Sequence, residues 1–217
     1  MTLNKYVFFD LETTGFELPQ HRNNALPKTP EDEIIQIAAI ATKGPPDFCE
    51  TSRFEIKIMP TPNGLGRMDT NHRANGFDFR YRENEWKDNS YTQGEGLREF
   101  AKYLSFNATM KKISKRGRPY KIALLAGHNV TKFDIPFLYA AFRKHDFFAP
   151  FSFLALDTLA LCPWLRALGM LDCEKSYLGS LCEHFGITLE DAHDALADVS
   201  ATVQIARKFC SMLGFIK

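Results

Sequence analysis

The chain lacks both an excess of charge of one sign and any long hydrophobic run. Its 217 residues carry 27 Lys and Arg against 26 Asp and Glu, and a net charge of +1 excludes the strongly basic class of proteins. The apolar stretch that ends at Asp10 is too short for a signal peptide or a membrane span. We therefore expect an intracellular protein of the cytoplasm or nucleus, not secreted and without a membrane partner.

The chain also lacks closely paired cysteines. Its five cysteines are an odd number without the spacing of a disulfide framework, which favours reduced thiols. Cys173, Cys182 and His184 could suggest a zinc site, but they lack the close ligand pairs of structural zinc sites. We expect buried thiols instead. The full set is Cys49, Cys162, Cys173, Cys182 and Cys210.

The first half of the chain predicts three strands separated by long loops. Lys5 to Asp10 is a buried strand before a turn, Glu33 to Ala41 is a second, and Arg53 to Met59 alternates as a half-buried third. The prolines and polar residues of Phe16 to Asp32 predict a loop. The stretch around 60–90 has no sustained period, so we expect a loop-rich insertion that holds short helical turns.

The second half predicts helices that alternate with strands. Leu97, Phe100 and Leu104 have helical spacing, and a basic loop follows around 111–118. Strands are expected at 120–126 and 153–156, and helices at 96–106, 135–144, 158–168, 177–185 and 195–212. Without internal repeats, this order predicts one α/β domain over 1–217, with a mixed sheet flanked by helices.

The basic run has three possible explanations. It could hold a phosphate backbone or a duplex beyond an active site, it could be a solvated loop, or it could serve nuclear targeting. The cations concerned are Lys111, Lys112, Lys115, Arg116, Arg118 and Lys121.

Asp10 and Glu12 are the first residues with chemical content. Residues two apart on a strand point the same way, roughly 6.6 Å apart. Two like charges at ~4 Å repel by about 4 kcal/mol at intermediate dielectric, and their desolvation adds to that cost. Either the two acids are solvated at a strand end, or a cation lies between them.

Two later segments bring further acids to the ends of elements. Asp134 follows Gly127-His128-Asn129 at the start of a predicted helix, where it could also complement the helix dipole. Asp198 interrupts a run of small and apolar residues in the last helix, for which Asp194 is a candidate N-cap. His193 precedes this helix, and alone it could be a helix-start residue bonded to nearby backbone.

Together, these acids favour a site for hard divalent cations such as Mg²⁺ or Mn²⁺. Two ions about 3.5–4 Å apart can stabilise the attacking and leaving oxygens of a phosphodiester. A histidine at the rim, with an ordinary pKa near 6.5, can deprotonate the attacking water.

Three motifs in order resemble those of the DnaQ-like exonucleases with a histidine, the DEDDh group. They are Phe9 to Gly15, Gly127 to Asp134, and His193 to Asp198, with Leu156 to Leu159 similar to an intervening segment. The third motif is most similar to the exonuclease I and proofreading-subunit branch. The resemblance implies a ribonuclease-H-like five-stranded mixed sheet, with a three-strand antiparallel meander plus parallel strands. It also implies release of nucleoside monophosphates from a 3′ end.

The resemblance also implies residue roles. Asp10 would bridge two ions, Glu12 and Asp198 would complete the tighter site, and Asp134 would support the second ion, directly or through water. His193 would be the general base. The predicted substrate contacts are Thr13, Thr14, Gly15, Phe16, His128 and Asn129. Phe16 could stack on a base for about 1–3 kcal/mol or pack in the loop, and His128 and Asn129 could instead stabilise the turn.

The predicted partner is a nucleic acid with a free 3′ end, with single-stranded DNA favoured over RNA. An exoribonuclease would use the same site. An endonuclease of the ribonuclease H type and a catalytically silent, polymerase-associated module are alternatives of other kinds. His193 and the Gly15-Phe16 segment favour the exonuclease, and the complete acidic set favours catalysis. A polymerase or repair partner is a further possibility.

Overall fold

A mixed sheet of six strands forms the centre of the protein, in the order β4-β3-β2-β1-β7-β8. The computed structural model describes residues 4–15, 32–62, 64–66, 90–189 and 194–214. The strands of this sheet are β1 (Lys5–Thr13), β2 (Ile34–Lys43), β3 (Glu50–Ile58), β4 (Ser90–Tyr91), β7 (Leu124–Gly127) and β8 (Leu156–Asp157). The named helices are α3 (Gln93–Phe106), α4 (Asp134–Lys144), α5 (Thr158–Ala167), α6 (Leu178–Phe185) and α7 (Ala195–Met212).

The strand pairing confirms the predicted mixed sheet. β1, β2 and β3 form an antiparallel meander, whereas β7 pairs parallel with β1, and β8 pairs parallel with β7. The sixth strand, which the sequence did not indicate, is the two-residue β4, parallel to the edge of β3. Its shortness explains the omission, because two residues carry no periodicity.

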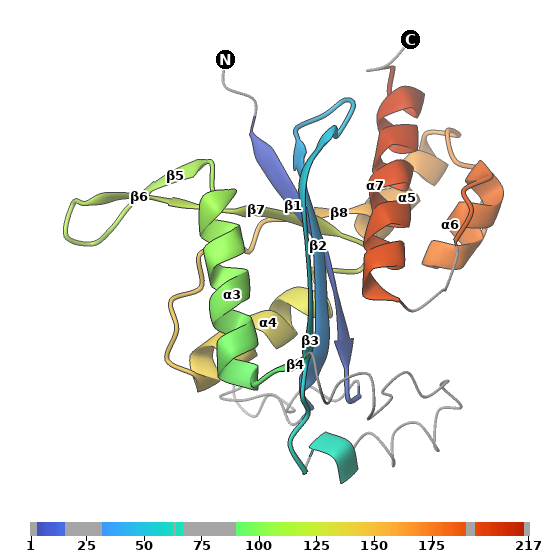
Figure 1. The fold of residues 1–217 in the computed structure, drawn as a ribbon. Helices are drawn as coiled ribbons and strands as arrows, with labels where there is room; N and C mark the ends of the chain where they lie inside the picture. Colours follow the sequence, from blue (N-terminus) through green and yellow to red (C-terminus); the bar gives the residue numbers. More distant parts are fainter. Residues whose placement is uncertain (1–3, 16–31, 63, 67–89, 190–193, 215–217) are drawn as a thin grey trace, which may run out of the picture.

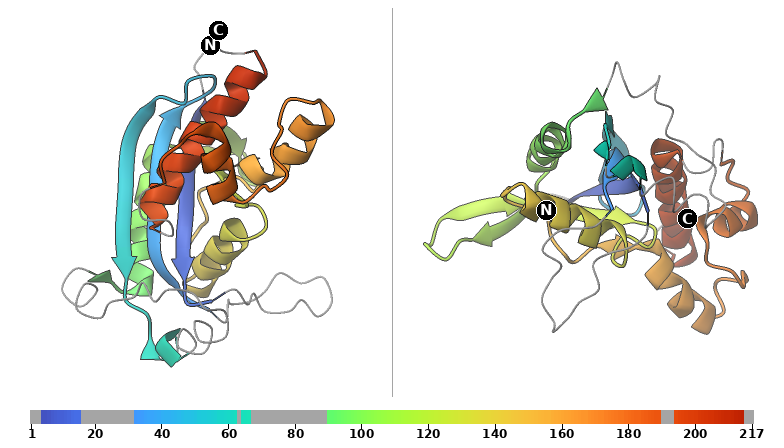
Figure 2. Two further views of the ribbon diagram at one scale, coloured as in Figure 1. Left: turned by 90° about the vertical axis from the view of Figure 1, so that its right-hand side faces the viewer. Right: turned by 90° about the horizontal axis from the view of Figure 1, so that it is seen from below.

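The two faces of β1 pack against different layers of helices. Val7, Phe9 and Leu11 pack with side chains from α3 and α4, whereas Phe8 packs with side chains from α7. Figures 1 and 2 show α3 and α4 on one side of the sheet and α7 on the other, with α5 and α6 beyond it. Because side chains alternate along a strand, Asp10 and Glu12 share the α7 face with Phe8.

Helix α7 begins where the sequence predicted. The Asp194 carboxylate accepts the Leu196 and Ala197 N–H groups at 3.0 and 3.1 Å, which is the bonding of an N-cap. Val199 and Val203 on its buried side contact the sheet. By fixing where α7 begins, the cap also fixes the position along β1 that Asp198, in the first turn, faces.

The predictions of one strand at 120–126 and of a basic loop before it were wrong in detail. The chain divides near Ala123: β6 (Pro119–Ile122) pairs with β5 (Met110–Ile113) in a separate hairpin, and β7 alone joins the main sheet. The basic residues concealed the strand, since they break the apolar pattern by which a strand is found. Of the strand expected at 153–156, only Leu156 lies in a strand, the two-residue β8, and a bridge between Ala123 and Phe151 precedes it.

The structure also bears on the predicted loops, the cysteines and the predicted lack of a membrane span. The loop from Phe16 and most of the 60–90 insertion lie outside the described residues, although residues 62 and 64–66 are helical, as expected for short turns. All five cysteines are free, with Cys162 and Cys182 buried and Cys49 exposed. Within the described part of the chain, no helix has the length and apolar character needed to cross a membrane.

Gly127 allows the close approach at the end of β7. A Cβ there would lie 2.8 Å from Val130 Cβ and 3.0 Å from the Phe9 carbonyl oxygen. We expect Gly127→Ala to lower the stability by about 1–3 kcal/mol, because both neighbours are fixed in the core. In the matched control Gly179→Ala, no atom lies within 4 Å of the new Cβ in α6, and stability should rise by about 0.5–1 kcal/mol.

Thermal unfolding measures both changes, at roughly 2–4 °C per kcal/mol for a chain of this size. Equal shifts of Tm in the two variants would contradict the steric argument.

Candidate metal centre

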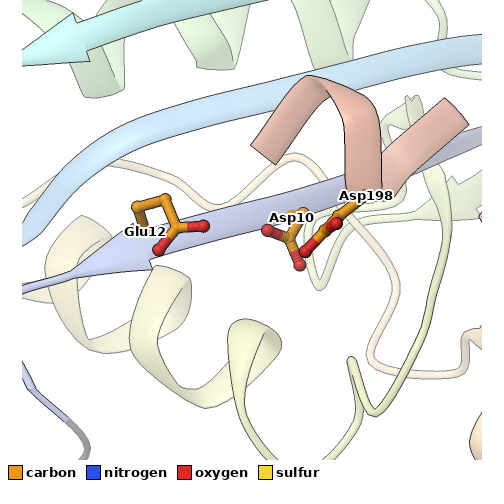
Figure 3. A group of neighbouring side chains, drawn as sticks. All are labelled: Asp10, Glu12 and Asp198. Atoms are coloured by element: carbon orange, nitrogen blue, oxygen red, sulfur yellow. The ribbon is translucent and has the colours of Figure 1, made fainter. Parts of the chain in front are cut away.

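Three carboxylates from two elements meet on the α7 face of the sheet. Asp10 and Glu12 extend from β1 and Asp198 from the first turn of α7, and each offers an oxygen within 4.8 Å of the others (Figure 3). All three side chains are half-buried. The alternation of β1 and the cap of α7 therefore assemble an all-oxygen donor set.

The cluster is electrostatically unfavourable without a cation. Burial is the main cause that raises the pKa of Asp10 well above its usual range, and repulsion from nearby carboxylates raises it further. Those carboxylates belong to Asp134, Glu12, Asp198 and Asp194. Carboxylate oxygens are the ligands that hard divalent cations prefer, and such an ion would offset the repulsion. The residues therefore fit a divalent metal.

Asp134 lies beside this cluster, in a different role. It is 3% exposed at the start of α4, and its Oδ1 accepts the Leu11 N–H at 3.1 Å. Leu11 lies beyond the last β1 residue that pairs with β7, so Asp134 provides an acceptor where the ladder has ended. Burial raises the pKa of Asp134 to about 8, against the lowering effect of backbone hydrogen bonds. Asp134 is thus a neighbour of the three-carboxylate group, and its charge acts on Asp10.

Two of the predicted site residues, His193 and Phe16, lie outside the described residues. His193 directly precedes Asp194, the N-cap of α7, in the sequence. Phe16 directly follows Gly15, two residues after the end of β1, in the sequence. Their predicted roles remain predictions.

The segment after β1 is held by its own hydrogen bonds. Thr14 is fully buried; its N–H donates to the Glu33 carbonyl at 2.8 Å, and its hydroxyl accepts the Glu33 N–H at 2.9 Å. The same hydroxyl donates to Asp32 Oδ1 at 3.3 Å, and Thr13 Oγ1 donates to the Gly15 carbonyl at 2.7 Å. In this structure Thr14 ties the end of β1 to the start of β2, a contact that the sequence analysis did not foresee.

Asp157 organises the turn that carries His128 and Asn129. Its carboxylate accepts the backbone N–H groups of Asn129 at 2.9 Å and Thr131 at 3.1 Å, and it also caps α5. Asn129 has a φ of 61°, a left-handed conformation that asparagine tolerates better than most residues. The family resemblance marked this segment but gave Asp157 no role. An acid before a helix was the available signal.

The His128 side chain, in the same turn, is held by a contact with Thr158. Its Nδ1 lies 2.9 Å from Thr158 Oγ1, and burial lowers the pKa of the ring below its usual value. A cavity of about 490 Å³ opens beside it, lined by His128, Asn129, Leu159 and residues 174–178. The structure therefore places His128 and Asn129 next to an open space, which is compatible with both roles considered for them.

Replacing Asp134 with Asn removes its titration but keeps an acceptor for Leu11. The pKa of about 8 in the folded protein lies above the ordinary aspartate value of 3.8, so the folded chain holds this proton more tightly than the unfolded chain does. That stabilisation is complete below about pH 4 and is lost as the pH rises towards about 8. We expect the Tm of the metal-free protein to fall between about pH 5 and 8, and to fall less in Asp134→Asn.

Asp134→Ala is the contrasting variant. It leaves the buried Leu11 N–H without its acceptor, so it should cost about 1–3 kcal/mol at every pH in that range. Parallel Tm profiles for wild type and Asp134→Asn would exclude the raised pKa.

Several solved structures of exonuclease I have a similar fold. E. coli exonuclease I in complex with a dT13 oligonucleotide superposes with a TM-score of 0.68 at 18% identity, covering 98% of this chain and 42% of that chain. A product-bound structure of exonuclease I gives 0.68 at 17% identity, covering 98% and 45%. The zinc-ion-bound form of the E. coli enzyme with single-stranded DNA gives 0.66 at 18%, covering 98% and 42%. At these low identities the structural likeness shows a shared fold, which is ribonuclease-H-like. The chain spans less than half the length of these exonucleases.

Sequence comparison gives the family. No curated protein matches the chain. A family model described as exonuclease (RNase_T) matches residues 91–206, more than half of the chain, including the second and third motifs through Asp134 and Asp198. The chain belongs to this exonuclease family, within the DnaQ-like group.

Proposed function

We propose that this protein is a 3′-to-5′ exonuclease that hydrolyses DNA, with single strands as its preferred substrate. The observation that carries the proposal is the meeting of Asp10, Glu12 and Asp198 within 4.8 Å on one face of the sheet. Membership of the exonuclease family and the fold shared with exonuclease I support it.

The three clustered carboxylates would hold the divalent cations, with Asp10 placed between Glu12 and Asp198 (Figure 3). Asp134 would support the second ion. A pair of Mg²⁺ or Mn²⁺ ions would supply positive charge to the attacking and leaving oxygens. The donor set of hard oxygens favours these cations over softer ones.

His193 acts as the general base in this proposal. It takes a proton from the attacking water, whose oxygen forms a bond to the terminal phosphorus while the bond to the preceding O3′ breaks. The leaving O3′ takes a proton from solvent, and His193 later returns its proton to solvent. The products are a nucleoside 5′-monophosphate and a strand shortened by one nucleotide, with a new 3′ hydroxyl.

The substrate end lies between the two turns that flank the cluster. Thr13 ends β1, Thr14, Gly15 and Phe16 follow it in the sequence, and His128 and Asn129 line the cavity of about 490 Å³. Since Thr14 is buried, its part is to position this segment, and Phe16 is the residue proposed to stack on a base. DNA is favoured because solved relatives are complexes with DNA oligonucleotides, among them dT13 and dA16.

Substitution of the clustered acids should remove activity. We expect Asp10→Asn, Glu12→Gln, Asp198→Asn and His193→Gln each to reduce 3′-end shortening by roughly 10²–10³-fold or more, because each removes a charge or a base used in the transition state. The assay uses 5′-labelled single-stranded DNA, duplex DNA and RNA with Mg²⁺ or Mn²⁺. Asp172→Asn, an exposed acid away from the cluster, is the matched control and should keep full activity.

The outcomes separate the alternatives. A ladder only on RNA would favour the exoribonuclease, cleavage of circular substrate would favour an endonuclease, and binding without cleavage would favour a silent module. Activity that persists in Asp10→Asn would refute the proposed metal site.

Asp10→Asn should have opposite effects on stability and on metal binding. Asp10→Asn removes the burial of a charge and the repulsion that together raise the pKa of Asp10, so the metal-free protein should unfold at a higher temperature, by roughly 2–4 °C per kcal/mol gained. The rise in Tm that Mn²⁺ produces in the wild type should be lost. A variant that loses stability and keeps the Mn²⁺ effect would show that Asp10 serves the fold and not a metal.

A further inference from the structure

The β5–β6 hairpin carries the strongest local charge of the described chain. Its basic run holds six cations, and the sequence contains no acid between Glu99 and Asp134. All six side chains are exposed, and none forms an ion pair with another residue in the described part of the protein. The near-neutral chain is therefore strongly asymmetric in charge. The cations are Lys111, Lys112, Lys115, Arg116, Arg118 and Lys121.

The hairpin is built to hold its cations in place. Across its tip, the Ser114 N–H donates to the Arg118 carbonyl at 2.9 Å, and the Arg118 N–H donates to Ser114 Oγ at 3.0 Å. Gly117 adopts a φ of 74°, which closes the turn. At the base, Ile122 is buried, and the Tyr120 ring packs edge-to-face on Phe148. The cations thus extend from an ordered ribbon.

The pairing register places like charges opposite each other. Lys111 pairs with Lys121, so the two side chains leave the same face of the ribbon from directly opposite positions. Like charges directly across a strand pair destabilise it. A hairpin that keeps this arrangement without an internal counter-ion is suited to an external polyanion.

The hairpin and the metal centre are joined by one strand. β7 leaves the hairpin beside Phe151 and ends at Gly127, next to Asn129. Figures 1 and 2 show the ribbon extending away from the body at the other end of this strand. From Gly127 back to Gly117 are ten residues, or roughly 33 Å at strand rise, which corresponds to about ten stacked nucleotides at 3.4 Å each.

The sheet edge between the hairpin and the metal centre carries exposed apolar side chains. Phe148, Phe153 and Leu154 are 66%, 53% and 78% exposed. Phe148 contacts Tyr120 of β6, and the other two lie between Phe151 and Leu156, which pair with Ala123 and Ala126. Exposed aromatic rings with nearby cations are the features by which proteins hold single strands without regard to sequence.

We infer that the β5–β6 hairpin binds the phosphate backbone of the substrate strand about ten nucleotides from the cleaved 3′ end. The inference rests on the proposed function, because a strand that enters the metal centre supplies the polyanion. The hairpin thereby makes the enzyme prefer strands long enough to reach it.

The test measures binding without cleavage. The affinity of 5′-fluorescein oligothymidylates of about 40 and about 5 nucleotides is followed by anisotropy in EDTA as salt is varied. The triple variant K115Q/R116Q/R118Q should bind the long strand at least about 10-fold more weakly, with a log–log salt slope smaller by about 2. Its affinity for the short strand should stay within about 2-fold, because that strand does not reach the hairpin.

Two further variants control for charge and folding. K43Q/K144Q/K208Q removes the same charge from exposed lysines elsewhere and should leave the preference for long strands intact. K111Q/K121Q removes the opposed lysines, so it should weaken long-strand binding while Tm stays equal or rises. Equal losses in the hairpin and control triples, or equal losses on both strand lengths, would overturn the proposal.

The remaining outcomes distinguish this proposal from the previous one. Vesicles containing phosphatidylserine test an anionic membrane as the partner, and a hairpin triple that loses only vesicle binding would overturn the nucleic-acid assignment. Wild-type protein that binds the long strand through the hairpin but shortens no nucleic acid with Mg²⁺ or Mn²⁺ would refute the proposed activity and leave the hairpin assignment standing.

Discussion

Repulsion among carboxylates on one face of the sheet is the constraint on which the site depends. Asp10, Glu12 and Asp198 lie within 4.8 Å of one another, and burial raises the pKa of Asp10 well above its usual range. Proteins keep such groups together when function requires it, since a well-packed apolar face would be more stable. The large core on the opposite face of β1, built from α3 and α4, provides the stability that this arrangement costs.

The acids of the protein divide into two kinds by what they bond. Asp134, Asp157 and Asp194 accept backbone N–H groups and thereby fix β1 to α4, the turn after β7, and the start of α7. Asp10 and Asp198 stand among other carboxylates instead. The first kind positions the second, because each of these backbone bonds fixes an element that borders the cluster. Geometry at the metal centre therefore follows from hydrogen bonds made one layer away.

Charge is separated along β7 in a way that suits a polyanionic substrate. The acids that would hold cations lie at its carboxyl end, and the exposed basic ribbon lies beyond its amino end. In the proposed complex, a phosphodiester strand would meet bound metal at one end and Lys and Arg side chains at the other. The net charge of +1 conceals this separation, because it sums 27 basic and 26 acidic side chains over the whole sequence.

Local patterns predicted most of the elements. The apolar runs of β1 and β2, the helical spacing of α3 and α7, and the Asp194 cap all follow from short-range rules. The β5–β6 hairpin was missed because its strands are basic and pair only with each other. The role of Thr14 was missed because its partners, Asp32 and Glu33, come from the next strand.

The sequence by itself determined which residues are candidates for the chemistry. Three motifs in order predict the acids and His193, because the spacing of residues within each motif is local. Only the tertiary structure decided how those acids lie together: it brings Asp198 to Asp10 and Glu12, and it places Asp134 beside them, where its Oδ1 also accepts the Leu11 N–H of β1. The physical reason is that β1 and α7 are separated by most of the chain, and their approach depends on packing across the whole sheet.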